Sequence, residues 1–153
     1  MKKCMNTELR LKQELKKLFN KQRLAVLATQ KNGQPYSSLV AFAATDDLKQ
    51  IIFATSRATR KYDHFSNDGR VALLIDSRTN KVADFHKAIA VTAVGTAVEA
   101  DQRVRQHYVK LYLNKHPHLT EVIQSPACAL VQILVKTYYV VRTFQNVVEL
   151  HVA

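Results

Sequence analysis

The sequence predicts a mainly β protein in which antiparallel strands form a barrel and helices pack around it. Three observations lead to this fold class. Six or seven apolar segments rich in β-branched residues are spaced along the chain, and the first three are joined by short turns. No β-α-β unit of the kind that builds a parallel sheet separates them. The chain has 153 residues, 47% of them hydrophobic, which suits a single domain over residues 1–153.

The N-terminal residues 1–20 are predicted to form an amphipathic helix. Apolar residues recur at helical spacing from Thr7 onward, while Lys and Glu occupy the other faces. Asn6 or Thr7 is a suitable N-cap, because its side-chain oxygen can accept a hydrogen bond from the first turn. The apolar positions are Leu11, Leu15, Leu18 and Phe19.

The next segments predict a meander of three strands at residues 23–29, 36–44 and 50–55. Asn32-Gly33 lies between the first two, and this pair favours the positive φ angles of a tight hairpin turn. Asp46-Asp47 marks the second turn. A helix is predicted over residues 56–67, with Ser56 as its N-cap and Asn67-Asp68-Gly69 as its end.

The C-terminal half predicts longer strands and about two more helices. A wholly apolar strand at 71–75 is expected to be buried on both faces, and a long strand at 87–99 contains Gly95, where we expect a bulge. A helix at 101–114 and a short turn or helix at 116–124 follow. Strands are expected at 127–141 and 147–152.

The formal charge of +11 favours anionic ligands or partners. The cations are spread over several segments, and no nucleic-acid motif or aromatic-basic interleaving accompanies them, so we expect no nucleic-acid partner. No segment is apolar enough for a membrane helix or a signal peptide, which predicts a cytoplasmic protein without a membrane partner. Cys4 and Cys128 are too few for a disulfide framework or a thiolate zinc site and are interpreted as incidental thiols.

The segment at residues 53–61 is the strongest candidate for a binding site. A strand ends there, and hydroxyl groups and three cations follow at the start of a helix, where unpaired N–H groups attract anions. Two interpretations stay open: a phosphate-binding cradle, or a capped helix with a basic exposed face. The side chains concerned are those of Thr55, Ser56, Arg57, Thr59, Arg60 and Lys61.

Other motifs are weaker indications of a functional site. His116-Pro117-His118 has no third ligand nearby and is interpreted as a loop, and Asp63 and His64 should point to different sides of a helix. Asp84-Phe85-His86 is placed in a loop before a strand, within reach of a bound cofactor in a dimer. The chain has none of the glycine-rich phosphate loops or hydrolase motifs.

Several segments, in order and spacing, resemble the pyridoxamine 5′-phosphate oxidase-like family of FMN-binding split β-barrels. They are LAVLAT (24–29), NGQPY (32–36), IFAT (52–55), TRK (59–61), NDGRVALL (67–74) and VTAVGTA (91–97). The resemblance implies an antiparallel split barrel and an FMN cofactor at the interface of a homodimer.

By position, the resemblance implies that Thr59, Arg60 and Lys61 bind the FMN phosphate, with Ser56 and Arg57 beside them. Ala54 and Thr55 would lie next to the cofactor. The second strand would face the isoalloxazine ring with Ser38, Leu39, Val40 and Ala41. The oxidase's substrate segment contains Arg and Trp, but this tail has only Arg142 and no Trp, so we expect no pyridoxamine 5′-phosphate oxidation.

The leading functional hypothesis is therefore an FMN-dependent oxidoreductase with a small-molecule electron donor, NAD(P)H among the candidates, and a small-molecule acceptor. Because the flavin carries the redox chemistry, such a site needs few catalytic side chains. The alternatives are a flavin-binding protein without turnover and a haem-handling relative with His86, His116 or His118 as ligand. A fourth hypothesis assigns the positive charge to nucleic acid.

Overall fold

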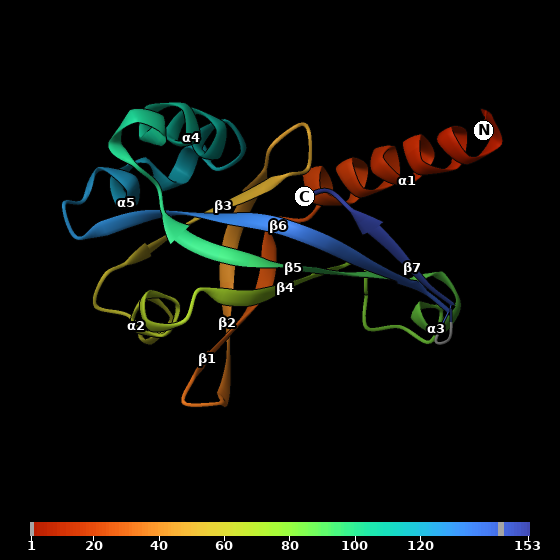
Figure 1. Ribbon diagram of the computed structural model, residues 1–153, viewed down its shortest axis with the longest axis horizontal. Helices are drawn as coiled ribbons and strands as arrows, with labels where there is room; N and C mark the ends of the chain where they lie inside the picture. Colours follow the sequence, from red (N-terminus) through yellow and green to blue (C-terminus); the bar gives the residue numbers. More distant parts are fainter. Residues whose placement is uncertain (1, 144–145) are drawn as a thin grey trace.

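The computed structural model describes residues 2–143 and 146–153, with side chains described from residue 5 onward. Within these residues, seven strands form one antiparallel sheet in the order β3-β2-β1-β4-β5-β6-β7. An additional pairing of β3 with β6 closes the first six into a barrel (Figure 1). The strands are β1 (Leu24–Lys31), β2 (Gln34–Ala44), β3 (Gln50–Ser56), β4 (Arg70–Asp76), β5 (Ile89–Glu99), β6 (Cys128–Arg142) and β7 (Asn146–His151).

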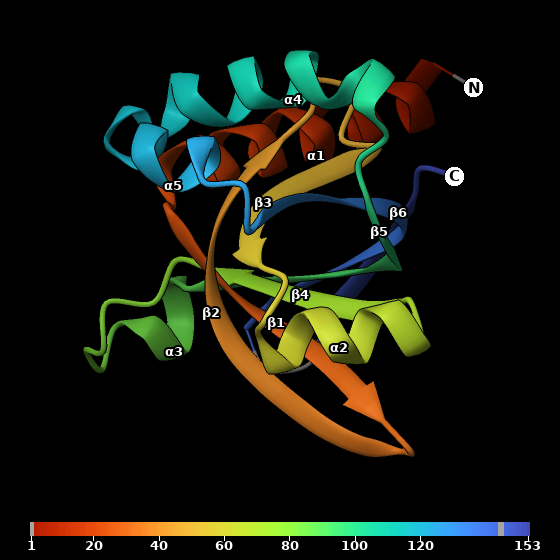
Figure 2. The ribbon, with the colours of Figure 1, turned by 90° about the vertical axis from the view of Figure 1, so that its left-hand side faces the viewer.

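The helices lie outside the barrel and cover its two ends and one flank. Figure 2 shows α4, with α1 behind it, above the strands and α2 below them. The bounds are α1 (Lys2–Lys21), α2 (Arg60–Asn67), α3 (Asp84–Lys87), α4 (Gln102–Lys115) and α5 (Thr120–Gln124), with a 3₁₀ turn, η1 (Pro117–Leu119), between the last two.

The apolar face of α1 packs into one end of the barrel. Phe19 is buried with its ring centroid 6.0 Å from that of Phe42 and 5.7 Å from that of Tyr138. At the other end, Phe65 of α2 packs edge-on against Phe53 at 6.2 Å. A second apolar cluster, including Ile52 and Leu130, lies on the outer face under α4 and α5. The barrel interior is therefore filled with side chains and leaves the surface of the barrel for ligands.

The predicted hairpin and bulge are both confirmed. Asn32 and Gly33 have φ angles of 52° and 78°, and Lys31 pairs with Gln34 across the turn. The β5–β6 register shifts between Val94 and Gly95. A Cβ atom at Gly95 would stand 2.2 Å from the main-chain oxygen of Leu134, so this position requires glycine for close approach.

Several predicted boundaries are wrong. The first helix spans Lys2–Lys21, close to the predicted residues 1–20, but Asn6 and Thr7 lie inside it and do not cap it, because no helix-breaking residue precedes them. The second begins at Arg60 with Thr59 as N-cap, not Ser56, because β3 continues through Ser56, which pairs with Cys128 of β6.

The strand predicted at residues 71–75 is buried on one face only. Val71, Leu73 and Ile75 point into the core, whereas Ala72 and Leu74 are half-buried on the outside. Asp84-Phe85-His86 forms the short helix α3 rather than a loop, with the carboxylate of Asp84 accepting from the turn before it. No helix of the described residues is long and apolar enough to span a membrane.

The barrel is split between β2 and β3. These strands pair only where Phe42, Ala43 and Ala44 meet Phe53, Ile52 and Ile51. Beyond Phe42 they diverge, and β3 instead pairs along its whole length with β6. Within the described residues, β2 from Gln34 to Ala41 therefore pairs only with β1.

Candidate functional site

The structure brings both predicted groups of site residues to the split. Continuing the β2–β3 register past Phe42 and Phe53 would pair Ala41 with Ala54 and Val40 with Thr55. These pairs are not formed, because the strands have separated there. Residues 38–41 therefore lie on one side of the split and residues 54–56 on the other.

The β2 side offers mainly main-chain groups. Val40 is 5% exposed and points into the core, whereas Leu39 is 65% exposed and points outward. The N–H of Phe42 donates to the carbonyl oxygen of Arg23, so Phe42 faces β1. Because successive residues of an antiparallel strand face alternate neighbours, the main-chain groups of Ala41 and Leu39 point toward the split.

One side chain on this strand lacks a partner. The Oγ atom of Ser38 is buried and forms no hydrogen bond with any described residue. A buried hydroxyl without a partner costs free energy, and such an atom often marks a missing ligand group. Ser38 lies on the same side of β2 as Val40, so its hydroxyl is on the inner side of the split.

The turn after β3 is held by hydroxyl groups. The Oγ1 atoms of Thr55 and Thr59 are 2.9 Å apart, and the Oγ1 of Thr59 donates to the main-chain oxygen of Ser56 at 2.9 Å. Thr59 also caps α2, since its Oγ1 accepts from the N–H of Tyr62 at 3.4 Å. The predicted hydroxyl residues thus meet, and they fix the start of the helix.

The first residues of α2 carry positive charge that nothing neutralises. The N–H groups of Arg60 and Lys61 form no hydrogen bond with any described residue, and their side chains form no ion pair there. Arg60 is exposed and Lys61 half-buried. A helix N-terminus favours anions, so two adjacent cations at this position create an anion-binding surface.

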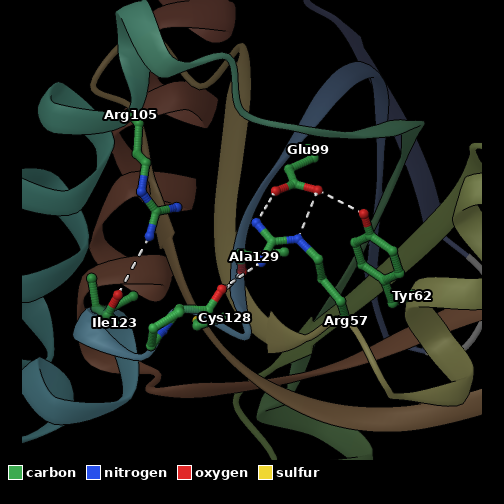
Figure 3. Close-up of polar contacts among 8 residues, drawn as sticks. Arg57, Tyr62, Glu99, Arg105, Ile123, Cys128 and Ala129 are labelled. Carbon is green, nitrogen blue, oxygen red and sulfur yellow. Dashed lines mark hydrogen bonds and ion pairs between the residues drawn. The ribbon is translucent and has the colours of Figure 1, made fainter.

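Arg57 has a different role from Arg60 and Lys61. Its guanidinium forms an ion pair with Glu99 and donates to the carbonyl oxygen of Pro126 at 2.9 Å (Figure 3). The Tyr62 hydroxyl also donates to Glu99, at 2.6 Å. Hydrogen bonding from Arg57 lowers the pKa of the Glu99 carboxyl. Arg57 therefore anchors the turn to β5, and its charge is already paired.

The three histidines considered as haem ligands do not form one group: the ring centroids of His116 and His118 lie 6.0 Å apart, but His86 belongs to a different element. His116 lies in the connection between α4 and η1, as predicted, but it is 1% exposed, and its Nε2 is 2.8 Å from the carbonyl oxygen of Phe42, so it packs between α4 and β2. His86 and His118 are exposed on separate elements. No group of three or more His, Cys, Asp or Glu among the described residues is arranged to hold a metal ion.

Asp63 and His64 diverge as predicted. Asp63 forms an ion pair with Lys31 on the surface, whereas His64 is buried with Nδ1 3.0 Å from the Oγ1 of Thr29. They therefore form no catalytic dyad.

A mainly apolar row, interrupted by one threonine, crosses the outer face of the sheet. The strand registers place Leu39 beside Val26, Val26 beside Leu74, and Leu74 beside Thr92, which pairs with Tyr139. We call these five residues the outer row. Leu39 is exposed, the others are half-buried, and none belongs to either buried cluster.

Sequence reasoning selected residues 53–61 as the candidate anion-binding segment but missed three neighbours. Glu99 pairs with Arg57, Tyr62 donates to Glu99, and Tyr36 lies under Arg60. Glu99 is 42 positions from Arg57, and no local pattern connects them. Tyr36 could have been found, because it shares the inner face of its strand with Ser38 and Val40 at a period of two.

Comparison with known proteins agrees with this architecture. Residues 11–143 match the family model described as pyridoxamine 5′-phosphate oxidase. No curated protein sequence gives a significant match.

Solved structures share the fold at low sequence identity. General stress protein 26 from Bacillus anthracis aligns with a TM-score of 0.71 and 21% identity over 92% of this chain and 98% of its own. An FAD-binding protein from Mesorhizobium loti aligns with a TM-score of 0.67 and 18% identity, over 84% and 90%.

A haem-binding protein from Mycobacterium smegmatis aligns with a TM-score of 0.81 and 14% identity over 92% of this chain. The alignment spans only 57% of that protein's length. At such identities the likeness establishes the fold alone.

Proposed function

We propose that this chain, which belongs to the pyridoxamine 5′-phosphate oxidase family, binds FMN at the split, with the phosphate at the start of α2. The observation that carries the proposal is the unpaired positive charge of Arg60 and Lys61 beside their unpaired N–H groups. A phosphate monoester supplies both the negative charge and the acceptor oxygens that this helix start lacks.

The other residues at the split suit the remaining parts of the cofactor. The Thr55 and Thr59 hydroxyls lie beside the helix start, and their hydrogen bonds to each other and to Ser56 hold the turn from which the N–H groups of α2 face the phosphate. The main-chain groups of Leu39 and the N–H of Ala41 can bond the polar edge of the ring, whereas the Ala41 carbonyl oxygen already accepts from the Tyr112 hydroxyl at 3.3 Å. Ser38 Oγ is an unused hydrogen-bonding group on the same strand. Bound FMN supplies the hydride and electron transfer itself.

We further propose that the protein is an oxidoreductase in which the chain binds and orients the flavin. Residues 38–41 and 54–61 contain no Asp, Glu, His or Cys, and their one lysine, Lys61, is assigned to the phosphate, so these segments leave no side chain for acid–base or thiol chemistry at the ring. Because the flavin carries the electrons and the chain only binds it, we propose a small-molecule electron donor such as NAD(P)H and a small-molecule acceptor. Both suit the expected cytoplasmic location. Pyridoxamine 5′-phosphate is not the proposed substrate, because residues 138–153 contain a single arginine and no Trp.

The outer row supports assembly as a homodimer. A mainly apolar row of side chains across a sheet face is stabilised when a second surface removes it from water. A second copy of the same chain offers the same row and gives the isologous contact that is commonest among oligomers. In such a dimer the split would lie close to the partner, as the family's cofactor site requires.

The absorbance spectrum of the purified protein tests the cofactor directly. We expect a flavin spectrum, and tighter uptake of added FMN than of riboflavin, because only FMN carries the phosphate. A haem spectrum, with no uptake of flavin, would replace the proposal by haem binding, which the similar haem-binding protein makes the second candidate. A protein that takes up neither would overturn both.

Turnover is tested separately on the FMN-loaded protein. Bleaching of the flavin by NADH or NADPH, followed by recovery in air or with an added acceptor, supports an oxidoreductase. A flavin that binds tightly but is reduced by no tested donor indicates flavin binding without turnover.

A further inference from the structure

The ring of Tyr36 lies between two side chains of α2. The Cζ atom of Arg60 is 5.3 Å from the centroid of the ring, within cation–π range. The ring of His64 meets it at a centroid distance of 5.5 Å and an angle of 79°. Arg60 and His64 are four residues apart and so share one face of the helix. Tyr36 therefore connects the projecting β1–β2 hairpin to the same face of α2 that carries Arg60.

The ring is supported from behind. Tyr36 pairs with Thr29 across the hairpin, and the Thr29 Oγ1 lies 3.0 Å from His64 Nδ1. Both Thr29 and His64 are buried, at 3% and 7% exposed. The Tyr36 hydroxyl itself forms no hydrogen bond with any described residue. The fixed part of this side chain is thus its ring, with one face toward Arg60.

We infer that Tyr36 is a positioning residue for the phosphate-binding arginine. Arg60 has no hydrogen bond or ion pair among the described residues. Its polar head group contacts the face of the Tyr36 ring instead. A long side chain loses rotamer freedom when it binds a ligand, and holding it beforehand reduces that loss. The ring keeps the guanidinium at the start of α2 while leaving its N–H groups available. This inference rests on the proposed phosphate site.

The experiment compares Tyr36→Leu with Tyr36→Phe. Leucine fills much of the space but has no π face, whereas phenylalanine keeps the face and loses only the hydroxyl. The measured quantity is the FMN preference, the ratio of the riboflavin Kd to the FMN Kd, in titrations of the apoprotein. An exposed cation–π contact corresponds to about a two- to fivefold change in affinity, so Tyr36→Leu should lower the preference by about that factor. Tyr36→Phe should keep it.

Arg60→Ala and the double variant Arg60→Ala/Tyr36→Leu complete a double-mutant cycle. If Tyr36 acts through Arg60, Tyr36→Leu has no further effect on the preference once Arg60 is absent. An equal effect of Tyr36→Leu in the wild-type and Arg60→Ala proteins would overturn the inference. A loss of FMN preference in Tyr36→Phe would also overturn it, because the Tyr36 hydroxyl itself would then bind the phosphate. If Arg60→Ala alone leaves the preference unchanged, the phosphate site itself is wrong.

A ligand-free measurement keeps the test decisive if Tyr36→Leu is poorly folded. In wild type and Tyr36→Phe, the ring current should shift the NMR resonance of the Arg60 Nε–H group, assigned by its loss in Arg60→Ala. The same resonance at the position typical of free arginine in both proteins would refute the contact.

Discussion

Removing the two cations at the start of α2 should abolish recognition of the FMN phosphate and spare recognition of the ring. Arg60 and Lys61 have no anionic partner among the described residues, so Arg60→Ala/Lys61→Ala breaks no ion pair of the fold. Arg60 and Lys61 are the first two residues of α2, and alanine, which replaces them, is a good helix former. The double variant should therefore fold normally.

The magnitude follows from the exposure of the two side chains. Charge-assisted hydrogen bonds contribute about 1.5–3 kcal/mol each. Arg60 is exposed and Lys61 only half-buried, so solvent screening favours the lower limit for both. Two contributions near that limit total about 3 kcal/mol, which corresponds to a loss of roughly 100-fold in FMN affinity. Arg57 should not compensate, because Glu99 already pairs with it.

The assay is titration of FMN and of riboflavin into the apoproteins, with binding measured by the quenching of flavin fluorescence. Lys17→Ala/Lys110→Ala is the matched control, since it removes the same charge from exposed positions on α1 and α4. FMN affinity should fall in the site variant alone, riboflavin affinity should barely change in either, and added salt should weaken FMN binding. Equal loss of FMN and riboflavin would mean that α2 supports the fold, and no loss would refute phosphate binding at Arg60 and Lys61.

Two further predictions concern assembly and packing. Light scattering at micromolar concentration should give the mass of a dimer, and Leu39→Glu should reduce that mass to a monomer's. Val122→Glu, the control at an exposed position on α5, should leave the dimer intact. A monomeric wild type would refute the dimer. Gly95→Ala should lower the free energy of unfolding in urea by about 3 kcal/mol, at the upper end for overpacking, because its Cβ meets the rigid main chain of β6. Gly33→Ala, where the cost is only the positive φ, should lose about 1 kcal/mol. Equal losses would contradict the close approach at Gly95.

Local patterns were sufficient to predict most strands and to select residues 53–61 as a candidate anion-binding segment. Alternation of apolar residues, the Asn-Gly pair and the glycine at the bulge are properties of short stretches, and the structure confirms the hairpin and the bulge. The run of hydroxyls and cations after β3 also lies within a single stretch of sequence. These predictions needed no knowledge of distant contacts.

The errors arose where distant residues determine the local structure. Serine is a common helix N-cap, but Ser56 pairs with Cys128 and therefore stays in the strand. The helix begins three residues later, with Thr59 as its N-cap. Arg57 has the same charge as Arg60, yet Glu99, far along the chain, decides that only Arg60 is available to a ligand. The assignment of cofactor residues from sequence remains a prediction, because it depends on a ligand and a second subunit.

The closure of the barrel by β3 and β6 sets the order in which the binding site can form. During synthesis β3 emerges long before Cys128–Leu134, its partner segment in β6. Pairings between residues so far apart form slowly, since a long loop must close before any contact forms. Until then one edge of β3 is open to other chains, and the turn that begins α2 is attached on one side only. We therefore expect a chain shortened before β6 to aggregate and to bind no flavin, although residues 38–41 and 54–61 would all be present.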